Sequence, residues 1–508
     1  MALTGRDAER EERLNDDTRH LGDPLIVHPR SEINSITTAV VVEGSCSDHP
    51  GSGNDNGSVS MVLFSTFVSV CGSFEFGTCV GYSSPTQSGI RKDIGLTLSE
   101  YSVFGSILTV GAMIGAITSG RIADSVGRKG AMRLAAVFCI SGWLAIFFSR
   151  GAFSLDLGRV FTGYGMGVFS YVVPVFIAEI TPKNLRGGLT TVNQLMICCG
   201  ASTGFIVGTV LSWRSLALVG IVPCILLLLG LFVVPESPRW LAKVGRWKEF
   251  NSALKRLRGK EADISDEAAE IQEYTRTLAY FPESGLLDLF QWRYAHSLIV
   301  GVGLMIFQQF GGINGICFYT RETLESAGYP SGSGTAIIGY IQPPINVLGA
   351  ILMDKCGRKP LIMFSATGTC LGSILTGAAF FLKGHELLMD WVPGLVFAGL
   401  LVYFAAFSTG MGAVPWVIMS EIFPINVKGT AGSLATTVNW FGSWVASYTF
   451  IFLMNWSQSG TFFLYAGVYV VAVVFVRILV PETKGRTLEE IQASMNASSS
   501  KELENIEI

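Results

Sequence analysis

The sequence has little charge for its length: only 15% of its 508 residues are Asp, Glu, Lys or Arg, and the formal net charge is −3. In a typical soluble domain charged residues make up about a quarter of the chain. Apolar residues account for 49% here, which is typical of a protein that crosses a membrane many times. The basic residues are scattered in short clusters, so the sequence predicts no nucleic-acid partner.

The sequence also lacks the spacings that hold metals or build a disulfide framework. It has no C-x-x-C pair and no histidine-rich tract, and most of its ten cysteines fall inside apolar runs. Such cysteines are expected to be buried free thiols. The chain has no G-x-x-x-x-G-K-[ST] loop to hold ATP and no nucleophile–base constellation. These absences argue against an ATP-driven pump and against an enzyme. They also predict that the protein holds no cofactor and no metal.

The chain is rich in apolar runs of the length that a helix needs to cross a bilayer, about 20 residues. Six runs precede a charged interval and six follow it. The predicted spans are 59–82, 101–120, 131–149, 155–177, 189–211, 215–235, 295–320, 334–353, 361–382, 391–419, 430–454 and 461–480. The sequence therefore predicts an all-α membrane protein with twelve transmembrane helices in two six-helix bundles.

Polar segments divide the chain around these runs. The predicted order is a disordered cytosolic tail (1–58), a first bundle (59–238), cytosolic linker helices (239–293), a second bundle (294–481) and a cytosolic tail (482–508). Lys and Arg concentrate in the loops after even-numbered spans, which predicts that both termini are cytosolic. The linker has helical apolar spacing, although a merely solvated linker remains the alternative.

The two halves repeat one another in the same motif order. In each half a Glu-x-x-Pro is followed by a base seven residues after the Glu and by Gly eight residues after it. The matched pairs are ADSVGRKGAM with MDKCGRKPLIM (123–132, 353–363), AEITPKNLRGG with SEIFPINVKGT (178–188, 420–430) and PESPRW with PETKGR (235–240, 481–486). A duplicated six-span unit is what a secondary transporter needs when its substrate lies between the halves near the midplane.

Carboxylates and bases gather at the predicted cytosolic ends of the spans. We expect them to form salt bridges when that side closes and to separate when it opens. The alternative is simple topological anchoring, which does not explain the repeated Glu–Pro–base–Gly spacing. The predicted gating residues are Asp124, Arg128, Glu179, Arg186, Asp354, Arg358, Glu421 and Lys428.

Four motifs, GRIADSVGRK, PESPRW, QQFGGIN and PETKGR, together resemble the sugar porters of the major facilitator superfamily over about residues 60–490. GYSSP and PWVIMSEIFPINVKG are most similar to plant early-responsive-to-dehydration-six-like monosaccharide transporters. The resemblance implies the major facilitator fold and transport of monosaccharides, hexoses such as glucose or fructose, by alternating access. The sugar-binding residues it implies are Gln194, Gln308, Gln309, Asn314, Gln342, Trp416 and Asn439.

The chemistry of these side chains agrees with that implication. Amides both donate and accept hydrogen bonds, as sugar hydroxyls do, and an amide facing lipid would be costly. Gln308 and Gln309 point about 100° apart on a helix, so one of them can serve packing instead. Trp416 can stack on a sugar ring, or it can serve packing, which is commoner for a tryptophan in a span.

Glu75 is a carboxylate in the interior of the first span. Proton-coupled sugar porters carry FGYD in this span, whereas this chain reads FGTC, so Cys79 stands in the place of the aspartate. Arg159 matches the arginine that pairs with that aspartate. Three interpretations stay open: Glu75 takes up a proton and reaches Arg159, it hydrogen-bonds to polar neighbours, or it is a substitution that weakens transport.

The sequence thus predicts a monosaccharide carrier that works by facilitated diffusion or by proton coupling. A carrier of a polyol or another organic solute and a non-transporting sugar sensor remain alternatives. The expected partners are the sugar, protons in the coupled case, and the lipid bilayer, and we expect a single chain to function as a monomer. Either the vacuolar or the plasma membrane fits the sequence.

Overall fold

The computed structural model describes residues 59–182, 185–259, 262–280, 286–423, 425–486 and 490. The chain divides into two units, and the account below concerns the larger, Ser52–Lys484 with Leu488–Ile508. The predicted N-terminal tail and most of the predicted C-terminal tail lie outside the described residues.

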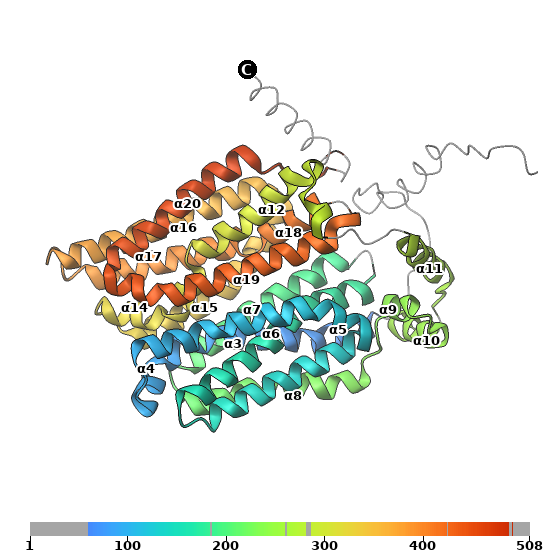
Figure 1. Ribbon diagram of the computed structural model, residues 1–508, viewed down its shortest axis with the longest axis horizontal. Helices are drawn as coiled ribbons and strands as arrows, with labels where there is room; N and C mark the ends of the chain where they lie inside the picture. Colours follow the sequence, from blue (N-terminus) through green and yellow to red (C-terminus); the bar gives the residue numbers. More distant parts are fainter. Residues whose placement is uncertain are drawn as a thin grey trace, which may run out of the picture. The chain divides into compact units, whose positions relative to one another are not determined.

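The first six spans lie in five long helices (Figure 1). The predicted second and third spans form one continuous stretch, α5, which breaks at Gly127, where the backbone has φ 83° and ψ 169°. A short helix, α4, follows α3. The bounds are α3 (Ser60–Gly81), α4 (Ser83–Ile94), α5 (Leu98–Phe147), α6 (Ala152–Ile180), α7 (Arg186–Val207) and α8 (Trp213–Val233).

The last six spans are interrupted more often. The predicted span 295–320 is interrupted at Gly312 (φ 90°) and continues in α13, and the span 391–419 contains a π-helical turn, η3. The bounds are α12 (Trp292–Phe310), α13 (Ile313–Phe318), α14 (Thr320–Ser326), α15 (Ser331–Cys356), α16 (Arg358–Gly384), α17 (Val392–Ala406), η3 (Phe407–Met411), α18 (Val414–Ile422), α19 (Ile425–Trp456) and α20 (Gln458–Leu479).

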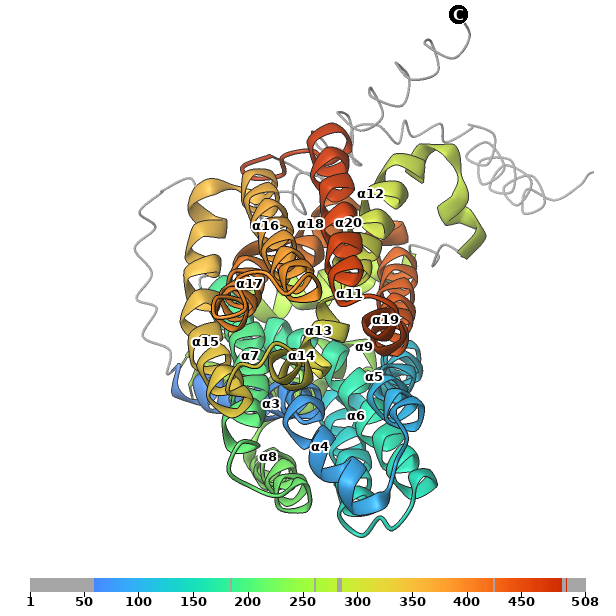
Figure 2. The ribbon, with the colours of Figure 1, turned by 90° about the vertical axis from the view of Figure 1, so that its left-hand side faces the viewer.

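The helices of each half form their own group (Figure 2). Between the groups, α19 packs beside α5 and α15 packs beside α7. Nine segments of the described chain are long and apolar enough to cross a membrane. One of them is α5, which has the length of two spans, and α7 contains a shorter apolar stretch, Thr191–Val207. Large apolar side chains such as Leu229 and Phe232 are exposed on the outside, as contact with lipid tails requires.

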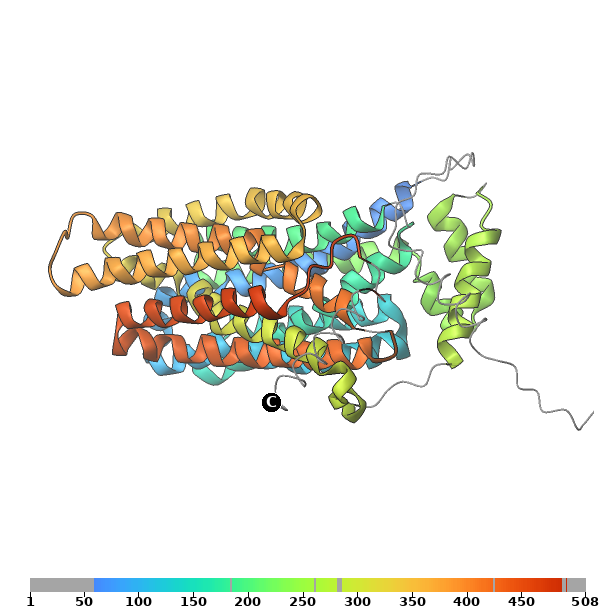
Figure 3. The same ribbon diagram turned by 90° about the horizontal axis from the view of Figure 1, so that it is seen from above.

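The segment between the halves is helical (Figure 3), and its buried apolar side chains form a small core of their own. It contains α9 (Pro238–Lys243), α10 (Trp247–Arg258), α11 (Ser265–Tyr280) and η2 (Leu286–Phe290). Helix α9 begins after Ser237, whose side chain accepts a hydrogen bond from the Trp240 N–H at 3.2 Å, a standard N-cap. We call the end of the bundles that carries these helices the linker end, and the opposite end the α4 end.

Close packing in the first bundle depends on glycine. A Cβ added at Gly163 would lie 2.1 Å from the Leu108 carbonyl oxygen, and one at Gly167 would lie 2.1 Å from the Ala112 carbonyl oxygen. These glycines let α6 approach the backbone of α5 directly, which is how helices associate in a membrane without a hydrophobic driving force.

Candidate functional site

Four amide side chains form a continuous network in the second bundle. The Gln308 Oε1 accepts hydrogen bonds from Asn439 Nδ2 at 2.8 Å and from Gln309 Nε2 at 3.4 Å. Asn314 Nδ2 donates to Gln309 Oε1 at 2.6 Å and to Ser443 Oγ at 2.8 Å. We call Gln308, Gln309, Asn314 and Asn439 the amide network. It joins α12, α13 and α19, so residues that are far apart in sequence share one polar centre.

Gln308 occupies the middle of this network, and both its amide oxygen and its amide nitrogen form hydrogen bonds within the protein. Its Nε2 donates to the carbonyl oxygens of Met411 at 2.6 Å and Gly412 at 3.0 Å. These carbonyls belong to the π-helical turn η3 and the residue after it, where regular helical bonding is interrupted. Gln308 therefore holds the broken span to α12, and its neighbours carry the amide groups with spare bonding capacity.

The other predicted sugar-binding residues lie outside the amide network. Gln194 on α7, Gln342 on α15 and Trp416 on α18 are each half-buried. The helices α7 and α15 come from opposite bundles and pack against each other. The structure thus places Gln194 and Gln342 on the two helices that meet between the halves.

Several polar and aromatic residues join this region without having been predicted. Asn193, one position before Gln194, accepts a hydrogen bond from Ser73 Oγ at 2.6 Å. Trp440 lies with its ring centroid 6.0 Å from that of Phe76, so this aromatic pair links α19 to α3. Both Asn193 and Trp440 are sequence neighbours of residues that were predicted, and that adjacency was the available signal.

Glu75 is fully buried inside the first bundle and forms no ion pair with Arg159. Its Oε1 accepts hydrogen bonds from Trp143 Nε1 at 2.5 Å and from Cys79 Sγ at 3.3 Å. Its Oε2 has no hydrogen-bond partner among the described residues. Both donors are neutral, so the contacts of this carboxyl group are the hydrogen bonds of the second interpretation.

Arg159 is also fully buried, and its contacts are to neutral groups. Nη1 donates to the Cys79 carbonyl oxygen at 3.0 Å, and Nη2 donates to Ser83 Oγ. The guanidinium lies over the rings of Phe104 at 5.0 Å and Tyr82 at 5.6 Å, which stabilise a cation. Cys79 therefore stands between Glu75 and Arg159, touching one with its thiol and the other with its carbonyl.

At the linker end, the predicted gating residues of the first half pair within their own bundle. Arg128 makes a two-pronged salt bridge to Glu179, with Nε–Oε2 at 2.8 Å and Nη2–Oε1 at 2.7 Å. Its Nη1 also lies 3.2 Å from Asp124 Oδ1. Asp124 in turn meets Lys243 of α9 at 3.0 Å, which ties the linker to this cluster.

The second half repeats the pattern with one bond. Arg358 Nη2 lies 2.9 Å from Glu421 Oε1, and Lys428 is exposed. The side chains of Arg186 and Asp354 lie outside the described part of the structure. The pairs seen here therefore stabilise each bundle rather than join the two bundles.

Two glutamates that the gate prediction did not include hold the duplicated turns. Glu236 accepts hydrogen bonds from the Lys129 N–H at 3.2 and 3.3 Å. Glu482 accepts from the N–H groups of Arg358 and Lys359, both at 3.0 Å. Each glutamate belongs to the repeated Pro-Glu motif after the last span of its half. The repeat therefore encodes hydrogen bonds between the end of each bundle and its GRK turn (127–129 and 357–359). We call each set of these bonds a latch.

The two latches differ electrostatically. Burial raises the pKa of Glu236 above its ordinary value, although hydrogen bonds from the N–H groups of Ser237 and Lys129 favour the charged form. Burial also opposes ionisation of Glu482, but hydrogen bonds from the N–H groups of Lys484, Arg358 and Lys359 outweigh it and lower its pKa. The stabilisation from Glu482 is therefore present at neutral pH and is lost as the pH falls through this lowered pKa.

Replacing Gly127 or Gly357 by alanine should destabilise the protein by about 1–3 kcal/mol each, because both adopt a backbone conformation essentially restricted to glycine. Gly357 has φ 91° and ψ 170°, and a Cβ there would lie 2.9 Å from Glu482 Oε2. At Gly127 the Cβ would lie 2.6 Å from Glu236 Oε2. Thermal unfolding of the purified variants in detergent measures the loss.

Gly151→Ala is the matched control for these variants. Gly151 has φ −160°, and a Cβ there would meet no heavy atom within 4 Å. Its unfolding temperature should equal that of the wild type. If all three variants and the wild type unfold at the same temperature, the two latches do not require glycine at positions 127 and 357.

Several hydrogen bonds join the two bundles at the α4 end, one of them from Ser102 Oγ on α5 to the Tyr448 carbonyl oxygen on α19 at 2.9 Å. Gln87 Nε2 donates to Glu322 Oε2 at 2.5 Å. The Arg321 N–H donates to Ser84 Oγ at 3.0 Å, and its Nη1 donates to the Pro85 carbonyl oxygen at 3.1 Å. We call these five residues of α4 and α14 the α4 clasp. It joins the bundles at this end, and the two halves of the sequence do not repeat it, so the repeat did not reveal it.

An apolar cavity of about 510 Å³ lies elsewhere, against α12 and α20. It is lined by Phe307, Phe463, Leu464, Gly467, Val468 and Val471. Such a lining offers no side-chain hydrogen bonds to a hydroxylated solute. The amide network, by contrast, offers groups that both donate and accept hydrogen bonds, and we take it as the candidate binding site.

The sequence profile of the family described as "Sugar (and other) transporter" matches residues 58–495. The chain belongs to this family. It is similar to "Sugar transporter ERD6-like 16" from Arabidopsis thaliana, at 59% identity over 489 residues, which cover 96% of this chain and 98% of the relative. The members that resemble the chain are transporters rather than enzymes.

Solved structures agree with the twelve-helix major facilitator fold. The inward-open xylose transporter XylE from E. coli is 28% identical, with a TM-score of 0.71, covering 85% of this chain and 99% of that one. The proton:xylose symporter XylE bound to 6-bromo-6-deoxy-D-glucose is 27% identical, with a TM-score of 0.67, covering 86% of this chain and 99% of that one. The chain is thus a membrane-spanning member of a sugar transporter family.

Proposed function

We propose that this protein carries monosaccharides, hexoses in the first place, across its membrane by alternating access. The amide network carries the proposal, because it gathers four side chains that both donate and accept hydrogen bonds at the breaks in the spans. A hexose presents hydroxyls with the same dual character. XylE, bound to a 6-deoxyhexose derivative, supports a sugar of this size.

We further propose that the structure represents the state open toward the cytosol, with the linker end cytosolic. The α4 clasp closes the opposite end, and the likeness to the inward-open XylE supports this assignment. Both termini then lie in the cytosol, as the distribution of Lys and Arg predicts. The Arg128–Glu179 and Arg358–Glu421 pairs would change partners when the linker end closes.

Facilitated diffusion is the mode that the geometry favours. Proton-coupled sugar porters hold an aspartate where this chain has Cys79, and the donors of Arg159 go to a carbonyl and a hydroxyl oxygen. No carboxylate pairs with Arg159 in the described structure, so a switchable ion pair is missing at this position. Sugar would then flow down its own gradient. A single chain in the bilayer would be sufficient for this transport.

Proton symport is the second candidate, and the likeness to the proton:xylose symporter XylE favours it. In that case Glu75 is the carboxyl group available to carry the proton. Cys79 connects it to Arg159, because its thiol donates to Glu75 and its carbonyl oxygen accepts from Arg159. An intramembrane carboxyl group of this kind is often functional.

Transport by the purified protein in liposomes tests the proposal. Vesicles loaded with D-glucose should take up labelled glucose by counterflow, and the uptake should saturate and be inhibited by other hexoses more strongly than by a polyol. Sugar binding without counterflow would replace the carrier by a sensor. Preferential inhibition by a polyol would replace the proposed substrate class.

A pH gradient without a sugar gradient separates the two modes. Under facilitated diffusion the wild type accumulates no sugar. Accumulation would establish symport instead, and Glu75→Gln should then abolish it while leaving counterflow intact. Localisation of a fluorescently tagged chain decides between the vacuolar and plasma membranes.

A further inference from the structure

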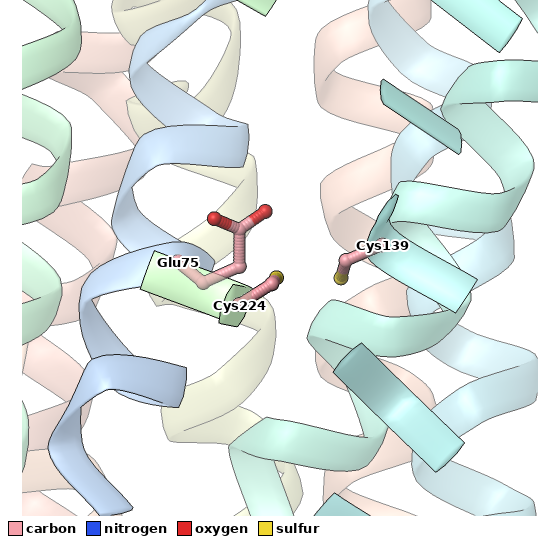
Figure 4. A group of neighbouring side chains, drawn as sticks. All are labelled: Glu75, Cys139 and Cys224. Carbon is pink, nitrogen blue, oxygen red and sulfur yellow. The ribbon is translucent and has the colours of Figure 1, made fainter. Parts of the chain in front are cut away.

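Facilitated diffusion leaves Glu75 without a task, although a buried carboxyl group is costly to keep in a membrane protein. Two thiols approach it from other helices, Cys139 on α5 and Cys224 on α8 (Figure 4). One ligand atom of each of these three residues lies within 4.8 Å of the other two, and all three side chains are buried. All three cysteines around Glu75, including Cys79, are free thiols.

From this arrangement we propose that Glu75, Cys139 and Cys224 form a binding site for a thiophilic divalent cation, with zinc as the resident ion. We call these three residues the thiol site. Two thiolates and a carboxylate are ligands that zinc accepts, and three protein ligands with one open position are a common zinc arrangement. Tetrahedral zinc with sulfur at about 2.3 Å places two sulfurs about 3.8 Å apart. The present ligand atoms, within 4.8 Å of one another, would therefore have to draw together by at most about 1 Å.

The unused oxygen of Glu75 is the second observation that points to a ligand. Oε2 is buried and has no hydrogen-bond partner among the described residues, while Oε1 accepts from Trp143 Nε1 and Cys79 Sγ. The carboxyl group is thus fixed through one oxygen with the other left for a cation. Donors that orient a ligating carboxylate in this way commonly increase metal affinity.

The charges of the site balance around one divalent ion. Binding releases the protons of the Cys139 and Cys224 thiols, because the thiolate is the ligand. Two thiolates and the Glu75 carboxylate then bring three negative charges against two positive ones. Arg159, whose Nη1 lies 3.0 Å from the Cys79 carbonyl oxygen, offsets the remaining charge. A site of this kind would tie α3, α5 and α8 together inside the first bundle.

Metal analysis of the full-length protein tests the proposal. The tag-free protein, purified in detergent without chelators, should contain about one zinc per chain by mass spectrometry of the elements. Exchange with cadmium should produce the ultraviolet charge-transfer band of cadmium–thiolate bonds. Cys139→Ser/Cys224→Ser should lower the zinc content at least tenfold and abolish the band.

Two further variants separate metal binding from folding. Cys356→Ser removes an exposed thiol and should retain both zinc and the band. Trp143→Phe keeps the three ligands but removes the donor to Glu75, and should weaken zinc binding roughly tenfold to a hundredfold. The metal content is compared only among variants that elute as single species.

Three results would overturn the thiol site. One is wild-type protein with less than about a tenth of a zinc per chain and no cadmium–thiolate band after exchange. Another is the same metal content in the wild type and in the folded Trp143→Phe and double-cysteine variants. The third is recovery of Cys139 and Cys224 as a disulfide in peptide mapping of the non-reduced protein.

Discussion

Gln308→Leu should weaken sugar binding on the order of a hundredfold. The substitution keeps the size of the side chain but removes the acceptor for Asn439 and the two donors to the Met411 and Gly412 carbonyls. Without these bonds Asn439 and the η3 turn are no longer held in position to meet the sugar, and a hundredfold change in affinity corresponds to about 2.7 kcal/mol. Equilibrium binding of labelled hexose and counterflow in liposomes measure the effect.

Thr437→Val is the control for this prediction. Thr437 lies on α19 near Asn439, but its hydroxyl donates to the Ser433 carbonyl oxygen of its own helix at 2.8 Å. Its sugar affinity should match that of the wild type. If Gln308→Leu binds sugar as tightly as the control, the amide network is not the binding site.

Glu322→Ala should open the α4 end. The bond between Gln87 Nε2 and Glu322 Oε2 at 2.5 Å joins the two bundles through a carboxylate, and hydrogen bonds to charged groups contribute about 1.5–3 kcal/mol. We expect this bond to break when the α4 end opens, so its loss should shift the equilibrium between states by roughly tenfold to a hundredfold.

Distances between spin labels on α4 and α15 follow that shift. Labels at Ser88→Cys and Ser333→Cys, both exposed positions, in a Cys356→Ser background should show a longer-distance population in Glu322→Ala. Asp390→Ala is the control, because Asp390 is an exposed carboxylate of the second bundle that does not belong to the α4 clasp. Unchanged distances in Glu322→Ala would show that the α4 clasp does not hold this end closed.

The sequence was sufficient for the spans and for the internal repeat, because apolar length and repeated glycines are local signals. It could not assign the bonds of Gln308, since the η3 carbonyls that it binds follow about a hundred residues later. It could not show that Trp143 would satisfy Glu75, because an indole in an apolar run has many possible neighbours. The α4 clasp escaped prediction for a different reason: it joins unlike segments, so no repeat marks it.

The role of the Pro-Glu motifs could not be predicted from the sequence, although the motifs themselves could be recognised. Their repetition was visible, but their role was not, because a glutamate after a span usually meets solvent. Only the fold brings Glu236 to the Lys129 N–H and Glu482 to the Arg358 N–H. In each case the positive-φ glycine of the GRK turn removes the Cβ that would otherwise block the carboxylate.

These latches have a consequence for the biogenesis of the protein. Each glutamate follows the sixth span of its half, so the first bundle is fastened to its own GRK turn by residues that precede the second bundle in the chain. The first half can therefore complete its tertiary bonds while the ribosome is still synthesising the second. We expect insertion into the membrane to proceed as two successive assemblies, with the second half packing on a first half whose tertiary bonds are already made.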